Sequence, residues 1–138
     1  MTAVASITGI GFDLVEIERI EGMLTRHGDA FLRRILHPDE DAGRARRSDG
    51  SAHLAGLFAA KEAVMKALGT GLSGAGFSEI RIVHSALGAP AVSLSGTAAE
   101  TARQRGVAGW HVSITHTRST AGAVAIAFGA SHGEIPTK

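Results

Sequence analysis

The spacing of apolar residues predicts short strands that alternate with helices along the chain. Apolar residues at every second position indicate a strand, and a recurrence at every third or fourth position indicates a helix. The expected strands are residues 8–16, 79–84, 91–95, 110–115 and 122–128. The expected helices are residues 14–26, directly continuing the first strand, then 31–36, a stretch that opens at 38, a long helix from about 51 to 68, and 98–105.

These elements predict an α+β fold in one compact domain. Residues 79–84 and 91–95, joined by a turn at 88–90, are typical of a β-hairpin. Residues 122–128 are apolar throughout, so this strand should lie inside an antiparallel sheet. We expect the sheet to pack against the long central helix, with residues 1–138 forming a single domain and the tail after about residue 130 frayed.

The long helix carries charges that its apolar surroundings do not explain. Residues 54–68 are apolar or small on nearly every face, which indicates a buried helix, yet Lys61, Glu62 and Lys66 interrupt it. Buried ionised groups are costly unless they are paired or face a metal or a charged ligand. The turn Gly69-Thr70-Gly71 that follows could bring backbone N–H groups close to an anion. Two interpretations stay open: a site for a phosphorylated ligand with a metal, or a solvated Lys–Glu pair followed by a glycine that ends the helix.

Two strands carry further candidate groups. Asp13 shares one face of the first strand with Gly9 and Gly11, where it could meet a ligand, or it could cap the helix expected from residue 14. In the strand at 110–116, Ser113 and Thr115 share a face and could bind a phosphate or a ribose, or satisfy a sheet edge. His116 lies at the end of this strand on the opposite face, where the alternative is an exposed loop histidine without a function.

Composition excludes several classes of protein. A hydrophobic content of 44% with 14 basic and 13 acidic residues excludes disorder and a general nucleic-acid binder. The absence of cysteine excludes disulfides and thiolate zinc sites, and it fits a cytoplasmic location. We expect neither a signal peptide nor a membrane span. Eighteen glycines with five Phe, one Trp and no Tyr predict a core of small residues, which association between subunits would supplement.

Arginines concentrate between residues 26 and 47 of this otherwise balanced chain. Arg26, Arg33 and Arg34 could form a docking face for an acidic partner, and they could equally belong to a solvated surface.

Three segments in order resemble the holo-[acyl-carrier-protein] synthases. The first is Gly9-Ile-Gly-Phe-Asp13-Leu-Val-Glu-Ile17, which resembles their amino-terminal G-x-D motif. The second is Phe58 to Gly71, which matches F-x-x-K-E-A-x-x-K-A-x-G-T-G almost letter for letter, and the third is the final strand pair from Trp110 to Ala127. Residues 31–40 also resemble the segment that the family has between the first two motifs. The resemblance covers almost the whole chain.

The resemblance implies transfer of 4′-phosphopantetheine from coenzyme A to a serine of an acyl carrier protein, with adenosine 3′,5′-bisphosphate as the leaving product. Asp13 and Glu62 would hold Mg²⁺, since hard oxygen donors suit this ion, and Lys66 would meet the pyrophosphate. Glu62 or a water on the metal is the favoured base for the serine, with His116 as the other candidate. The expected contacts with coenzyme A are Lys61, Lys66, Gly69, Thr70, Gly71, Gly88, Pro90, Ser113, Thr115 and His116.

The resemblance further implies a homotrimer with sites at its subunit interfaces. Asp13 and Glu62 of one chain would then face Ser113, Thr115 and His116 of its neighbour. The chain departs from the family pattern at Leu57 and Ala89, where the family usually has a cationic residue. The departure at Leu57 favours an alternative function: a non-catalytic module with the same fold that binds a carrier protein or a nucleotide. The intact Asp13, Glu62, Lys66 and Gly-Thr-Gly set favours the enzyme.

Overall fold

The computed structural model describes residues 4–40, 42–44, 47–70 and 76–131. The elements, in chain order, are β1 (Val4–Glu16), α1 (Ile17–Ile35), α2 (Gly50–Leu68), the 3₁₀ helix η3 (Phe77–Glu79), β2 (Ile80–His84), β3 (Pro90–Leu94), α3 (Gly96–Gln104), β4 (Gly109–His116) and β5 (Thr120–Ser131). They form an antiparallel three-stranded sheet in the order β1-β5-β4 and the antiparallel β2-β3 hairpin. The predicted α+β class, the hairpin and the internal position of the last strand are confirmed.

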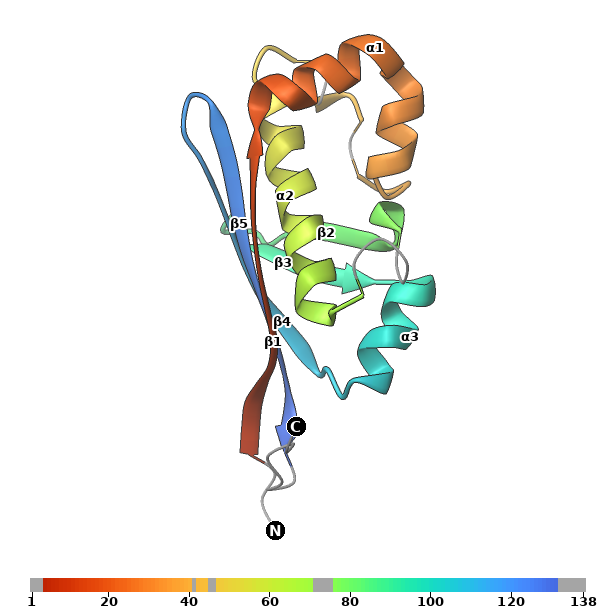
Figure 1. Ribbon diagram of the computed structural model, residues 1–138, viewed down its shortest axis with the longest axis vertical. Helices are drawn as coiled ribbons and strands as arrows, with labels where there is room; N and C mark the ends of the chain where they lie inside the picture. Colours follow the sequence, from red (N-terminus) through yellow and green to blue (C-terminus); the bar gives the residue numbers. More distant parts are fainter. Residues whose placement is uncertain (1–3, 41, 45–46, 71–75, 132–138) are drawn as a thin grey trace.

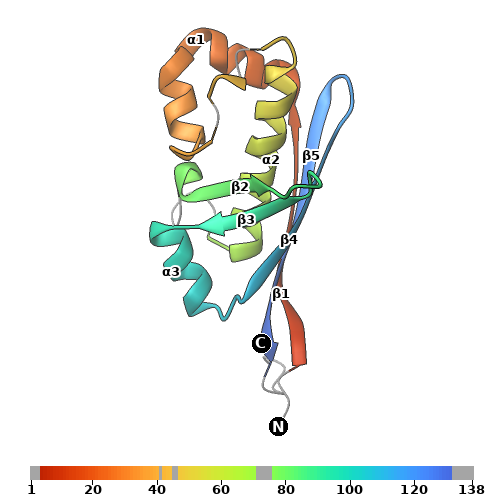
Figure 2. The same ribbon diagram turned by 180° about the vertical axis from the view of Figure 1, so that it is seen from behind.

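Helix α2 runs through the centre of the molecule and packs along one face of the three-stranded sheet (Figures 1 and 2). Helices α1 and α3 and the β2-β3 hairpin lie on the same side of this sheet as α2. Thirteen of the nineteen residues of α2 are buried, and most of these are alanine, leucine or another small or apolar residue. The hydrophobic core therefore surrounds one helix, as its nearly uniform apolarity predicts.

Two glycines allow β1 to lie directly against α2. A Cβ atom at Gly9 would come within 2.1 Å of the Ala67 carbonyl oxygen, and one at Gly11 within 1.8 Å of the Ala63 carbonyl oxygen. Only glycine tolerates so close an approach of two backbones. Because alternate residues of a strand share a face, Asp13 continues this row toward α2.

The opposite face of the three-stranded sheet is uncovered in a single chain (Figure 1). Ile7, Ile10, Phe12 and Leu14 of β1 project from it, with 58–68% of each residue exposed. Ser113 and Thr115 of β4 lie on this same face, because their β5 partners, Val124 and Gly122, pair with Phe12 and Leu14. Exposed apolar area of this kind is characteristic of an interaction surface.

The first helix differs from its prediction in two ways. β1 continues to Glu16 and the helix begins at Ile17, so Asp13 lies inside a strand and does not cap the helix. The two expected helical stretches are parts of α1, separated by a break at Gly28, where φ is +50°. Pairing with β5 keeps the chain extended up to Glu16, which pairs with Thr120. The next N–H, that of Ile17, donates to the Ser119 carbonyl at 2.9 Å, and the helix begins there.

The prediction of a helix that opens at residue 38 is wrong, because residues 37–40 form a turn. The Glu40 carboxylate explains the difference. It accepts hydrogen bonds from the backbone N–H of His37 at 2.7 Å and of Ile82 at 3.0 Å, and it pairs with Lys61 of α2. These tertiary bonds hold the segment against α2 and β2 and override the local helix signals.

The third helix, expected from residue 98, begins earlier in the structure. α3 starts at Gly96, and the Glu79 carboxylate from η3 accepts the Thr97 N–H at 2.6 Å. Glu100 instead pairs with Arg103 on the helix surface. Gly106, with φ of +72°, follows the end of the helix.

Candidate active site

Asp13, Glu62 and Lys66 meet where β1 crosses α2. Lys66 Nζ donates to Asp13 Oδ1 and to the Phe12 carbonyl, each at 3.0 Å. The Asp13 side chain is 15% exposed and the Lys66 side chain is 51% exposed, so this pair lies at the edge of the fold, open to solvent on the lysine side. Glu62 lies one turn before Lys66 on the same helix and is half-buried. The structure thus brings Asp13 together with two predicted catalytic residues that lie 49 and 53 positions further along the chain.

Glu62 has the electrostatic environment of a functional carboxylate. Burial raises its pKa, and the negative charge of Asp13 raises it further, while Lys66 and Arg19 oppose the shift. A carboxyl with a raised pKa is a better proton acceptor than an exposed glutamate. Two carboxylates whose charges interact are also typical of a cation site.

The donor set fits Mg²⁺. This ion is usually held by one or two carboxylates together with waters and the phosphates of a substrate. Within the described parts of the chain, no group of three or more His, Cys, Asp and Glu residues surrounds a common point. Asp13 and Glu62 therefore suit a metal ion whose remaining ligands are water and a substrate phosphate. They do not form a closed structural metal centre among the described residues.

Arg19 was missed by the sequence analysis. It lies in the first turn of α1, contributes to the field at Glu62, and its guanidinium carbon lies 5.8 Å from the centre of the Phe58 ring. No local pattern marks this arginine, because it reaches Phe58 of α2 only through the way the chain turns from β1 into α1.

Lys61 does not take the role expected of it. Its side chain is fully buried, and its ammonium donates to the Ile35 carbonyl at 2.7 Å and to the Glu40 carboxylate. Burial lowers the pKa of Lys61, and the hydrogen bond and charge of Glu40 oppose the shift. The expected contact of Lys61 with coenzyme A is wrong for this structure, because the ammonium group is buried and bound to partners inside the fold.

A pocket of about 400 Å³ collects a second group of predicted residues at the other edge of the sheet. Gly88 and Pro90 from the β2-β3 turn, His116 from the end of β4 and Leu57 from α2 line it. The same pocket contains Arg44, from the arginine-rich segment, and two histidines that the sequence analysis missed, His53 and His84. These histidines come from α2 and β2, so only folding brings them together.

The remaining candidate contacts lie apart from this pocket. Ser113 and Thr115 lie on the outer face of the sheet, opposite to His116. Gly69 adopts φ of +72° and ends α2, as the plain alternative for the glycine turn proposed, and Arg105 lies close to it. Thr70 follows at the end of the helix, and Gly71 lies outside the described residues.

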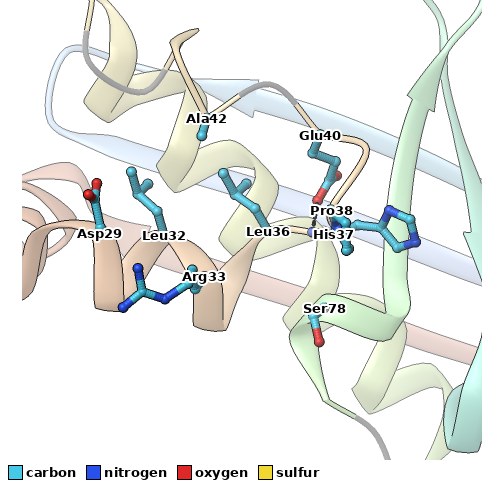
Figure 3. A pocket seen from close by; sticks show the side chains of 9 residues that line it. All are labelled: Asp29, Leu32, Arg33, Leu36, His37, Pro38, Glu40, Ala42 and Ser78. Atoms are coloured by element: carbon cyan, nitrogen blue, oxygen red, sulfur yellow. Dashed lines mark hydrogen bonds between the residues drawn. The ribbon is translucent and has the colours of Figure 1, made fainter.

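The three arginines of the possible docking face are exposed on α1. Arg26 precedes the break at Gly28, and Arg33 and Arg34 form the last turn of the helix. Arg33 lines a cavity of about 560 Å³ between α1 and the following segment. Figure 3 shows that Leu32 and Leu36 extend into this cavity toward Ala42, so its wall combines apolar and basic groups.

Comparisons with known proteins agree with this geometry. Residues 9–126 match the model of the 4′-phosphopantetheinyl transferase superfamily. The holo-[acyl-carrier-protein] synthase of Solidesulfovibrio magneticus is 50% identical over 121 residues, which cover 87% of this chain and 97% of the relative.

Solved structures agree as well. The crystal structure of the Neisseria meningitidis holo-[acyl-carrier-protein] synthase is 36% identical, with a TM-score of 0.81, and the match covers 88% of this chain and 98% of that one. The Helicobacter pylori enzyme in complex with coenzyme A is 35% identical, with a TM-score of 0.75, and covers 86% of this chain and 98% of that one. The chain therefore belongs to the 4′-phosphopantetheinyl transferase superfamily and, within it, to the holo-[acyl-carrier-protein] synthase type.

Proposed function

We propose that this protein transfers the 4′-phosphopantetheine group from coenzyme A to a serine of an apo acyl carrier protein. The serine oxygen forms a bond to the β-phosphorus of the coenzyme's pyrophosphate, the bridging P–O bond breaks, and adenosine 3′,5′-bisphosphate leaves. The serine proton passes to a base. The cluster of Asp13, Glu62 and Lys66 carries this proposal, because it offers two carboxylates and a solvent-facing ammonium at one point.

Each residue of the cluster has a part in this reaction. Lys66 donates to the pyrophosphate as a point charge, which its half-exposed side chain can reach by releasing Asp13. Asp13 and Glu62 would hold Mg²⁺, which when bound neutralises charge on the phosphate oxygens. Glu62, with its raised pKa, is the favoured acceptor of the serine proton. Within a single chain His116 does not reach this cluster, because it lines the pocket at the other edge of the sheet.

A homotrimer with interfacial sites would unite the two groups of residues. The carboxylate cluster lies on the β1 side of α2 and the pocket with His116 lies on the β4 side. A head-to-tail contact that closes into a ring could place one group against the other on a neighbouring subunit. The exposed apolar row on β1, beside Ser113 and Thr115, supplies a surface for this contact.

In the described residues, no helix is long and apolar enough to cross a membrane. The absence of cysteine is consistent with the cytoplasmic location that we propose.

Incubation with coenzyme A, Mg²⁺ and an apo carrier protein tests the proposal. We expect the mass of the carrier protein to increase by one phosphopantetheine group and adenosine 3′,5′-bisphosphate to appear in equal amount. Omission of Mg²⁺ should stop both. Binding of coenzyme A and carrier protein without any change in mass would contradict transfer and support the non-catalytic module.

The basic residues of α1 should serve as the docking surface for the carrier protein. Replacing both Arg33 and Arg34 with Ala should raise the KM for carrier protein about three- to tenfold and leave the KM for coenzyme A unchanged, because charges at the rim of an interface act mainly on association. Added salt should reduce the advantage of the wild type. Arg103→Ala, which removes an exposed arginine of α3, is the control. Equal responses of the double variant and the wild type to salt would assign these arginines to a solvated surface.

A further inference from the structure

The pocket between α2, the β2-β3 turn and the end of β4 has an unusual set of polar groups. Four basic side chains line its volume of about 400 Å³: Arg44, His53, His84 and His116. Asp49 is the one acidic residue of its lining, and it lies 3.9 Å from Arg44. Asp49 offsets only part of the charge of Arg44 across this exposed contact, and three imidazoles complete the polar lining. Imidazole is the side-chain group whose charge ordinarily changes between about pH 5 and 8.

The histidines come from three elements that converge on one apolar wall. His53 lies on α2, one turn before Leu57, and helical side chains point toward the N-terminus of their helix. Leu57 is buried and gives this wall no charge of its own. His84 ends β2 beside the turn, and His116 ends β4. The imidazoles are therefore the groups through which this wall can bind a charged ligand.

An adjoining pocket of about 360 Å³ shares Arg44, His53 and His84 and adds Asp39, Glu40 and Arg81. Its acids are already compensated within the protein. Glu40 pairs with Lys61, and Asp39 lies 3.7 Å from Arg81 and 3.8 Å from His37. Neither acid is free to neutralise a protonated histidine fully.

The surroundings of His53 disfavour its protonated form in the free protein. Burial lowers its pKa, the positive charges of Arg44 and His84 lower it further, and Asp49 and Glu40 oppose the shift. Asp49 and Glu40 each already pair with another cation, Arg44 and Lys61, so an anion in the pocket would supply the counter-charge for protonated imidazoles.

We propose that His53 and His84 form, beside Arg44, a proton-dependent site for the phosphomonoester of the coenzyme's nucleotide. This inference rests on the proposed function. The site distinguishes nucleotides that carry this phosphate from those that lack it, strongly in mildly acid solution and weakly in alkaline solution. Arg44 attracts the anion at every pH, and the histidines add charge-assisted hydrogen bonds only when they are protonated.

The direction of the pH effect follows from linkage. Binding of the anion raises the histidine pKa, so binding takes up protons. The gain in affinity is complete below the pKa of the free protein and disappears as the pH rises through the pKa of the complex. A charge-assisted hydrogen bond of this type changes affinity by about tenfold or more.

Calorimetric titration with adenosine 3′,5′-bisphosphate and with adenosine 5′-monophosphate tests the site. The two ligands differ in the 3′-phosphate, and their ratio of Kd values measures the preference for it. We compare the wild type with the double variant His53→Gln/His84→Gln at pH 6 and pH 8. The variant should lose about tenfold in preference at pH 6 and little at pH 8. Ionisation of the ligand cancels, because both proteins meet the same ligand at each pH. His27→Gln, an exposed histidine on α1, is the matched control and should keep the wild-type preference.

NMR titration of the wild-type histidine rings provides a test that needs no variant. The pKa of His53 should rise more with the bisphosphate than with the monophosphate. Equal preferences in the wild type and the double variant at pH 6, or equal His53 titrations with the two ligands, would overturn the inference and leave the proposed transfer intact. A wild type that binds neither nucleotide would contradict the proposed function itself.

Discussion

Glu62→Gln and Asp13→Asn should each reduce phosphopantetheine transfer by about a thousandfold, because preorganised charge in an active site is worth on the order of 10²–10³ in rate. An amide keeps the shape of the side chain and loses the negative charge that Mg²⁺ requires. In Glu62→Gln the favoured proton acceptor is lost as well. Neither substitution removes packing, and thermal unfolding should shift by only a few degrees.

The measurement is a transfer assay over a range of Mg²⁺ concentrations, combined with direct titration of Mg²⁺ into the protein with nucleotide present. Glu100→Gln, an exposed glutamate on α3, is the control and should behave as the wild type. Because burial and Asp13 raise the pKa of Glu62, Mg²⁺ affinity should increase as the pH rises through that raised pKa. Transfer at the wild-type rate in either variant would exclude the two-carboxylate site.

Lys61→Met should destabilise the protein by about 3–5 kcal/mol, because it leaves the carboxylate of Glu40 buried without a cation. The Glu40 side chain is 5% exposed, and it also joins the 37–40 turn to β2 through the N–H groups of His37 and Ile82. Loss of the lysine therefore weakens the contacts that hold residues 37–40 against β2. Free energies of unfolding from urea denaturation measure the effect.

A second substitution separates charge from packing. Adding Glu40→Gln to Lys61→Met should recover part of the loss, since the uncompensated charge is gone and an amide oxygen still accepts a backbone N–H. Lys66→Met, on the same helix, is the matched control and should cost about 1 kcal/mol or less, as its ion pair with Asp13 is half-exposed. Equal destabilisation by Lys61→Met and Lys66→Met would show that the buried pair contributes nothing special.

Local patterns in the sequence predicted most of the elements and one half of the site. The sequence predicted β4 from its alternating residues, β5 from a continuously apolar run, and α2 from its nearly uniform apolarity. It also predicted the hairpin at 80–94 from two short strand patterns joined by a turn. Glu62 and Lys66 were readable for a related reason, since four residues of helix place them side by side. The alternation in β1 placed Asp13 on the same face as Gly9 and Gly11, and the structure shows that this face lies against α2.

Tertiary structure alone decided which charges are enclosed in the fold and which stay open to solvent. Lys61 and Lys66 have the same chemistry and lie on one helix, yet Lys61 points to Ile35 and Glu40 while Lys66 points to Asp13. The partner of each is more than twenty residues away in sequence, so helical period cannot tell them apart. The same reason hid Arg19, His53 and His84. A sequence pattern reports neighbours along one element, whereas electrostatic environment depends on the groups that folding brings from other elements.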